Sequence, residues 1–126
     1  MSRVLDASAV LAYLHREPGW EEVRTMIGDA CISAIAWNEV AQRAARQGFD
    51  AGAARTLLAE LGLDIVPFTA EHAETAAHLG EETHGSALSL ANRACLALAI
   101  ERGLETVTAD RAWEHLRADL SIRMLR

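Results

Sequence analysis

Short apolar segments alternate with longer helical patterns along the whole chain, and this alternation limits the possible folds more than any other feature. The segments that read as strands are Val4-Leu5, Cys31-Ile32, Ile65-Val66, Thr106-Val107 and Ile122-Arg123-Met124. The helical patterns between them fill residues 7–15, 20–27, 34–47, 50–61, 70–83, 89–102 and 111–116. Strands that alternate with helices pair in parallel and carry helices on both faces of the sheet. We therefore predict an α/β/α sandwich around a parallel sheet of four or five strands.

Glycine stands at or just past the end of several of these helical patterns, at Gly48, Gly62, Gly85 and Gly103. Glycine is the usual stop signal there, because it adopts the left-handed conformation that closes a helix. A chain of 126 residues is long enough to bury one core, and no repeat or linker-like stretch divides it. We expect a single domain over residues 1–126.

The composition, with 51% hydrophobic and 24% charged residues, is that of a soluble globular protein. The longest apolar run, from Ala94 to Ile100, is too short to cross a bilayer. A strand and then Asp6 follow the N-terminus almost at once, without the pattern of a signal peptide. We expect a cytoplasmic protein that does not enter a membrane.

The net charge is −6, and the chain contains no lysine, because Arg supplies all 12 basic residues. An acidic domain lacks the footprint of a general nucleic-acid binder, whose affinity comes from neutralising phosphates. The absence of lysine excludes a Walker phosphate loop. It also disfavours receiver domains and phosphatases of the haloacid dehalogenase type, which use a strand-end Asp together with a Lys. Cys31 and Cys95 lie in apolar contexts, so we predict two buried thiols without a disulfide.

Polar residues stand at four junctions between a predicted strand and a predicted helix. Asp6 follows the first strand, and Asp110 follows the strand that contains Thr106. Glu39 lies in the helical pattern after the second strand, and Asn92 lies near the start of the pattern 89–102. Ligands bind at the carboxyl ends of the strands in open α/β sheets. Converging carboxylates attract hard divalent cations.

Each of these residues also has a purely structural explanation. Asp6 and Asp110 could be N-caps that accept hydrogen bonds from free helical N–H groups. Glu39 could pair with Arg43 one turn further on, and Asn92 could simply occupy the first turn of a capped helix. The joint pattern favours a site, because carboxylates gathered at one edge repel one another unless cations neutralise them.

Four segments resemble the acidic motifs of PIN-domain ribonucleases, and they occur in the order expected of that family. These segments are Val4 to Ala12, Ile32 to Val40, Leu88 to Ala99 and Thr106 to Trp113. Their combination is similar to the VapC subgroup, the toxins of bacterial VapBC toxin–antitoxin pairs. The resemblance extends from about residue 3 to residue 124.

The resemblance implies a Mg²⁺ or Mn²⁺ site formed by Asp6, Glu39 and Asp110, with Asn92 where an Asp normally stands. It implies hydrolytic cleavage of single-stranded RNA, in which a cation activates water and stabilises the leaving oxygen. A neutral amide in place of a carboxylate weakens cation binding. We therefore expect the endoribonuclease activity of this chain to be attenuated or absent.

Further residues beside the acids complete the predicted site. Ser8 and Thr108 could orient ligands or waters. Arg93 and Arg111 could hold RNA phosphates through paired N–H groups, or they could be solvated or ion-paired surface residues. The resemblance also implies a cognate antitoxin as partner and a homodimer. Two alternatives remain open: a catalytically disabled PIN domain that binds antitoxin or RNA, and a nuclease that acts on DNA.

Overall fold

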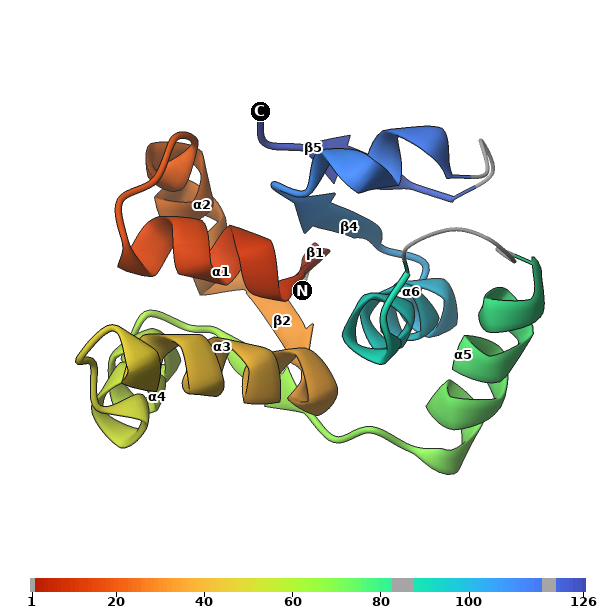
Figure 1. Ribbon diagram of the computed structural model, residues 1–126, viewed down its shortest axis with the longest axis horizontal. Coiled ribbons are helices and arrows are strands. Elements are labelled where there is room, and N and C mark those ends of the chain that lie inside the picture. Colours follow the sequence, from red (N-terminus) through yellow and green to blue (C-terminus); the bar gives the residue numbers. More distant parts are fainter. Residues whose placement is uncertain (1, 83–87, 117–119) are drawn as a thin grey trace.

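The five strands form one parallel sheet in the order β3-β2-β1-β4-β5. The computed structural model describes residues 2–82, 88–116 and 120–126. The strands are β1 (Arg3–Leu5), β2 (Ala30–Ser33), β3 (Asp64–Val66), β4 (Glu105–Thr108) and β5 (Ile122–Met124). This order places β1 at the centre, between β2 and β4 (Figure 1). The predicted parallel sheet is confirmed, with five strands.

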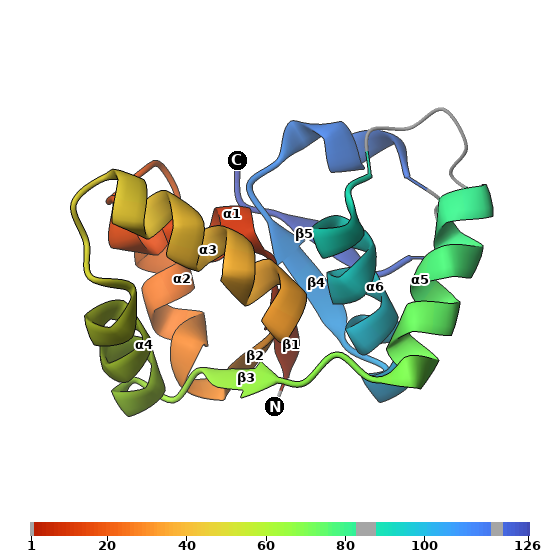
Figure 2. The same cartoon turned by 60° about the horizontal axis from the view of Figure 1, so that its bottom comes forward.

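Helices cover both faces of this sheet. They are α1 (Ala7–Leu14), α2 (Trp20–Met26), α3 (Ala34–Arg46), α4 (Ala51–Glu60), α5 (Ala70–Glu82) and α6 (Leu90–Arg102). Figure 2 shows α1 to α4 on one side of the strands and α5 and α6 on the other, which confirms the predicted sandwich. None of the helices in the described part of the chain is long and apolar enough to cross a membrane.

The predicted helix over residues 111–116 is a 3₁₀ helix, η2 (Arg111–His115), and a second one, η1 (Ile27–Asp29), precedes β2. In η2 the Trp113 N–H donates to the Asp110 carbonyl and the Leu116 N–H donates to the Trp113 carbonyl. These bonds span three residues rather than four, which is common in short helical segments.

Glycine ends the helices as the sequence predicts. Gly48, Gly62 and Gly103 have φ values of +86°, +106° and +65°, a backbone region that residues with a Cβ atom rarely adopt. Gly62 also passes close to Gly28, because a Cβ atom at Gly62 would lie 2.9 Å from the Gly28 Cα. The predicted stop at Gly85 lies outside the described residues.

The core lies between the sheet and its two helical layers, with β1 and the middle of α6 at its centre. Residues 94–99 of α6 are all buried. Cys31 and Cys95 are buried free thiols, as predicted. Burial raises the pKa of Cys31, and burial together with the nearby Asp6 charge raises the pKa of Cys95 well above its usual value. Burial therefore favours the neutral form of both thiols.

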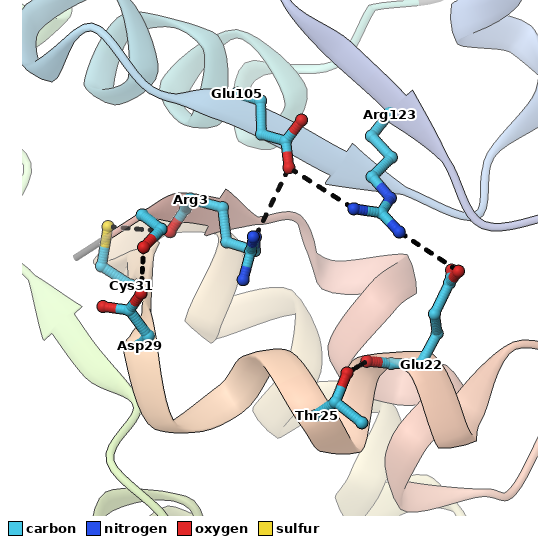
Figure 3. A network of polar contacts seen from close by, with 8 residues as sticks. Arg3, Glu22, Thr25, Asp29, Cys31, Glu105 and Arg123 are labelled. Carbon is cyan, nitrogen blue, oxygen red and sulfur yellow. Dashed lines mark hydrogen bonds and ion pairs between the residues drawn. The ribbon is translucent and has the colours of Figure 1, made fainter.

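Charged side chains are paired with one another at the amino end of the sheet (Figure 3). Arg3 and Glu105, the first residues of β1 and β4, are partners in the register, and their side chains are 3.4 Å apart. Arg123 of β5 lies 3.9 Å from the same Glu105 carboxylate and 3.2 Å from Glu22 of α2. This network links three strands with one helix.

Candidate functional site

Asp6 is the most deeply buried of the four predicted site residues, with 2% of its surface exposed. It follows β1 and caps α1, because its Oδ1 accepts from the Ala9 N–H at 2.9 Å. The same oxygen accepts from the Ser8 hydroxyl at 2.7 Å, and Oδ2 accepts from the Thr108 hydroxyl at 2.6 Å. These donors are hydroxyl and backbone groups, not the cationic side chains that pair with acids at the amino end.

This environment raises the pKa of Asp6 to about 6. Burial is the largest cause, because it disfavours the charged form. The hydroxyls of Thr108 and Ser8 and the Ala9 N–H oppose the rise, whereas the Asp110 charge adds to it. A carboxylate in this setting is stabilised by a nearby cation, and the same cation would lower its pKa.

Ser8 and Thr108 connect Asp6 to the backbone that leads into Asp110. The Ser8 hydroxyl accepts from the Ala109 N–H at 2.9 Å, and the Thr108 hydroxyl accepts from the Asp110 N–H at 3.0 Å. The two hydroxyl oxygens lie 3.3 Å apart. Each hydroxyl therefore donates to the Asp6 carboxylate and is itself fixed by a backbone donor, which sets the direction of its proton.

Asp110 is exposed and caps η2, where its Oδ1 accepts from the Ala112 N–H at 2.9 Å. The structural explanation as an N-cap therefore holds for both Asp6 and Asp110. It does not compete with a site, since the charge of Asp110 also acts on Asp6. The neighbouring strands β1 and β4 bring these two residues to the same edge of the sheet.

Glu39 lies in the second turn of α3, half-buried, and its Oε1 is 3.6 Å from the Arg43 guanidinium. This is the pair expected from spacing along the helix. Glu39 also belongs to the neighbourhood of Asp6, because both charges raise the pKa of the buried Cys95. α3 packs against both α1 and α6, and it begins directly after β2, at the carboxyl end of the sheet.

Asn92 lies in the first turn of α6 and is half-buried. Its backbone N–H donates to the hydroxyl of the N-cap Ser89 at 3.1 Å, so the expected cap is present. Of the two arginines predicted to hold phosphates, Arg111 is 70% exposed and lies 2.9 Å from Glu114. Arg93 donates instead to the Ala76 carbonyl of α5 at 3.0 Å.

The donor set fits a hard cation by its chemistry. Asp6, Asp110 and Glu39 offer carboxylate oxygens and Asn92 offers an amide oxygen, which are the ligand types of Mg²⁺ and Mn²⁺. The charge of Asp110 adds to the rise in the pKa of Asp6. Across residues 2–82, 88–116 and 120–126, however, no three His, Cys, Asp or Glu side chains are close enough to enclose a metal ion. Asp6, Glu39 and Asp110 are therefore not gathered into a group of three ligands in this structure.

A cavity of about 270 Å³ lies between the end of α1 and the start of α4, away from the acids. Tyr13, Leu14, Arg16, Phe49 and Leu57 are among the residues that line it. Phe49 and Leu57 are 43% and 45% exposed. Phe49 directly follows Gly48 and Leu57 lies within α4, and large apolar residues at these positions of the sequence fit a core equally well.

Comparison with known proteins identifies the family. The family model of the PIN domain matches residues 3–119, and the chain belongs to this family. Solved structures of the same fold include a toxin–antitoxin complex, VapBC2 and the toxin VapC20, so the chain has a VapC-like toxin fold. No curated protein matches the sequence.

Three of these structures cover nearly the whole chain at low identity. A toxin–antitoxin complex from Klebsiella pneumoniae is 19% identical over 99% of this chain and 98% of its own, with a TM-score of 0.79. VapBC2 from Rickettsia felis, bound to a promoter DNA fragment, is 14% identical over 98% of both chains, with a TM-score of 0.78. VapC20 from Mycobacterium tuberculosis, a sarcin-ricin loop cleaving toxin, is 14% identical over 90% of this chain and 93% of its own, with a TM-score of 0.73.

Proposed function

We propose that this chain, as one domain over residues 1–126, is a metal-dependent endoribonuclease toxin of the VapC type that hydrolyses single-stranded RNA. The observation that carries the proposal is the buried Asp6 carboxylate, which has hydroxyl donors and faces the Asp110 charge at the carboxyl edge of a PIN fold. RNA as substrate is supported by family membership and by VapC20, a relative in fold that cleaves the sarcin-ricin loop.

In this proposal Asp6, Asp110 and Glu39 hold Mg²⁺ or Mn²⁺, and Asn92 offers its amide oxygen. When bound there, the cation would supply a water of lowered pKa and positive charge beside the leaving oxygen. The hydroxyls of Ser8 and Thr108 keep the Asp6 carboxylate oriented and favour its charged form.

Arg111 is the residue that we propose for phosphate binding, because it directly follows Asp110 and is largely exposed. Its ion pair with Glu114 costs little to break at the surface. Arg93 follows Asn92 and is a second candidate, although one of its N–H groups is already bonded to α5.

Asn92 makes this chain a slow enzyme. An amide has one neutral acceptor oxygen where a carboxylate has two anionic ones, so the pocket has three negative charges instead of four. Binding of at least one cation weakens, and activation of water weakens with it. The same substitution favours the second candidate function, a catalytically disabled PIN domain that binds antitoxin or RNA.

Replacing Asp6 or Asp110 by Ala tests the metal site. Calorimetry should detect Mn²⁺ binding to the unchanged chain and no binding to either variant. Asp64→Ala is a matched control, because Asp64 is an exposed acid at the start of β3, and it should bind as the unchanged chain does. Mn²⁺ binding that persists in both Asp6→Ala and Asp110→Ala would exclude this site.

Oligonucleotide cleavage separates the functions. A metal-dependent RNase cuts single-stranded RNA in Mn²⁺, is inhibited by EDTA and leaves DNA of the same sequence intact. A nuclease that cuts the DNA faster belongs to the DNA-acting alternative. If the chain binds RNA but cuts neither the RNA nor the DNA, and the Asn92→Asp variant also cuts neither, the protein is a binding module.

We propose a cognate antitoxin and a second copy of the chain as its partners in the cytoplasm. The antitoxin is supported by the VapBC complexes of the same fold and by the acidic site, which favours a partner with a basic or polar side chain. The apolar cavity between α1 and α4 offers this partner an anchor. Light scattering should detect a dimer alone and a larger assembly with the antitoxin, and a monomer in both samples contradicts the proposal.

A further inference from the structure

The first turn of α6, which contains Asn92, extends beyond the part of the helix that the core holds. Residues 94–99 are buried, whereas residues 90–93 are half-buried or exposed. Helix ends fray when only their own hydrogen bonds hold them. Within the first turn, the exposed Ser89 accepts two such bonds, from the Asn92 N–H at its hydroxyl and from the Arg93 N–H at its carbonyl. Leu88, just before the cap, packs against the core, and a contact between the turn itself and a neighbouring element would further fix the position of this turn.

Arg93 makes this contact. Its Nη1 donates to the Ala76 carbonyl oxygen in the middle of α5 at 3.0 Å. α5 and α6 lie side by side in both views (Figures 1 and 2). A carbonyl inside a helix accepts one bond from its own helix and keeps a second lone pair. A cationic donor uses that lone pair in a bond about twice as strong as a neutral one.

Gly80 makes room for this guanidinium. A Cβ atom at Gly80 would lie 3.0 Å from Arg93 Nη1 and 3.5 Å from its Cζ. Gly80 is inside α5, where glycine weakens the helix relative to alanine. The structure accepts this weaker residue at the point where Arg93 approaches α5. Arg93, Ala76 and Gly80 together form what we call the α5–α6 clasp.

We propose that Arg93 is a positioning residue: through the α5–α6 clasp it holds the first turn of α6, and with it Asn92, at the edge of the acidic site. The importance of Asn92 for the site rests on the proposed function. The holding of the turn by Arg93 does not, since it follows from the contacts of Arg93 and Gly80 alone.

Gly80→Ala tests the clasp without changing any charge. The added methyl displaces the far end of a flexible side chain, and alanine favours the helix, so the protein should fold. In metal-free protein, NMR should detect amide exchange in residues 93–95 that is faster by about tenfold, the loss expected for one charge-assisted hydrogen bond. Calorimetry should find Mn²⁺ affinity weaker by about threefold to tenfold, since a helix turn that opens more often presents Asn92 less often.

Two further variants serve as a negative control and as an independent test of this result. Gly52→Ala makes the same exchange within α4, where the nearest atom to the new Cβ is the Asp50 Oδ1 at 3.4 Å. It should leave both measurements unchanged. Arg93→Met keeps most of the side-chain stem but removes the donor, and it should reproduce the effects of Gly80→Ala.

The outcomes separate this proposal from the proposed function. Unchanged exchange in Gly80→Ala and Arg93→Met overturns the clasp, and Arg93 then remains a candidate for phosphate binding. Faster exchange with unchanged Mn²⁺ affinity overturns the positioning role. If the unchanged chain binds no Mn²⁺, the metal-dependent function fails, while the exchange measurement still decides whether Arg93 holds the turn.

Discussion

At the amino end of the sheet, the Glu105 carboxylate lies beside two arginines, Arg3 and Arg123, whereas at the carboxyl end the Asp6 carboxylate is bonded to hydroxyl and backbone donors. The two carboxylates belong to neighbouring strands or follow directly from them, so the sheet itself does not cause the difference. Asp6 is also the more deeply buried of the two. Among the described residues, guanidinium groups thus stand where charge links elements, and none is bonded to the Asp6 carboxylate, where the charge is most costly.

The different surroundings of these two carboxylates indicate different roles for the two ends of the sheet. An ion pair at a partly exposed position adds little to stability and needs no further ligand. A buried carboxylate that faces a second acid destabilises the fold at neutral pH unless a cation is present. The carboxyl end therefore lowers the stability of the fold at neutral pH, as is common at functional sites.

The largest expected effect is at the carboxyl end. Asn92→Asp should raise the rate of RNA cleavage in Mn²⁺ by a factor on the order of a hundred or more, comparable with the effect of one well-placed electrostatic group in other enzymes. A gel assay with a labelled RNA measures this rate. Asn38→Asp is the matched control, because it adds the same charge at an exposed position on α3. Equal rates for the unchanged chain and the Asn92→Asp variant would remove position 92 from the site.

The second prediction concerns stability against pH in metal-free protein. Because the pKa of Asp6 is about 6 in the folded state, against 3.8 for the same group without these surroundings, the folded protein binds an extra proton between these values. The contribution of Asp6 to the free energy of unfolding is therefore fully present below pH 3.8. It is lost as the pH rises to 6, by about 3 kcal/mol in all. The difference in unfolding free energy between Asp6→Asn and the unchanged chain should grow by this amount from about pH 4 to about pH 7.

Urea titrations in EDTA measure this difference, and comparison with Asp6→Asn cancels the titration of all other groups. Mn²⁺ at neutral pH should restore much of the lost stability in the unchanged chain and little in Asp6→Asn. A constant difference across this pH range would mean that Asp6 is not held in the environment described.

A third, smaller effect is expected from Thr108→Val, which keeps the shape of the side chain but removes its hydroxyl. The Asp6 carboxylate loses its hydrogen bond at Oδ2, and the Asp110 N–H loses its acceptor. The unfolding free energy at neutral pH should fall by about 2 kcal/mol. The pKa of Asp6, followed by carboxyl NMR, should rise further, because this hydroxyl lowers it. Thr106→Val, at a buried threonine in the same strand, is the control, since its hydroxyl has no partner within the described residues.

The smallest effect is expected at the amino end. Arg3→Gln should lower the unfolding free energy by roughly 0.5 to 1 kcal/mol, the usual range for partly exposed pairs. The loss should shrink in high salt, which screens such pairs. A loss from Arg3→Gln that exceeds the loss from Thr108→Val would reverse the comparison between the two ends.

Most of the fold follows from local sequence signals, because helix stops and strand alternation act within a few residues. The glycines at positions 48, 62 and 103 ended helices as predicted, since only glycine easily adopts a positive φ. The pitch of η2 was not predictable, because a segment this short forms whichever hydrogen bonds its capping residue and its neighbours allow.

The positions of Asp6 and Asp110 after their strands were predictable, but the hydrogen bonds around them were not. A position after a strand places Asp6 and Asp110 at the carboxyl edge whatever the details of packing. The bonds of Ser8 and Thr108, in contrast, depend on the register of two strands and on rotamers, which no spacing in the sequence encodes. The contact of Arg93 with α5 also depends on Gly80, which lies in a different helix. The sequence showed only that Arg93 stands beside Asn92, and this position alone led to the prediction of a phosphate contact.

The pairing of β1 with β4 affects the order in which parts of the protein fold during synthesis. Thr108 and Asp6, which share a hydrogen bond, are 102 positions apart, and the strands that hold them are direct neighbours. Contacts over such a separation form late, because a long loop must close before they are gained. During synthesis, β2 can pair with β1, and β3 with β2, long before β4 leaves the ribosome. The nascent chain can therefore form most of its core while the edge with the acidic residues is still incomplete. The last fifth of the chain then completes this edge.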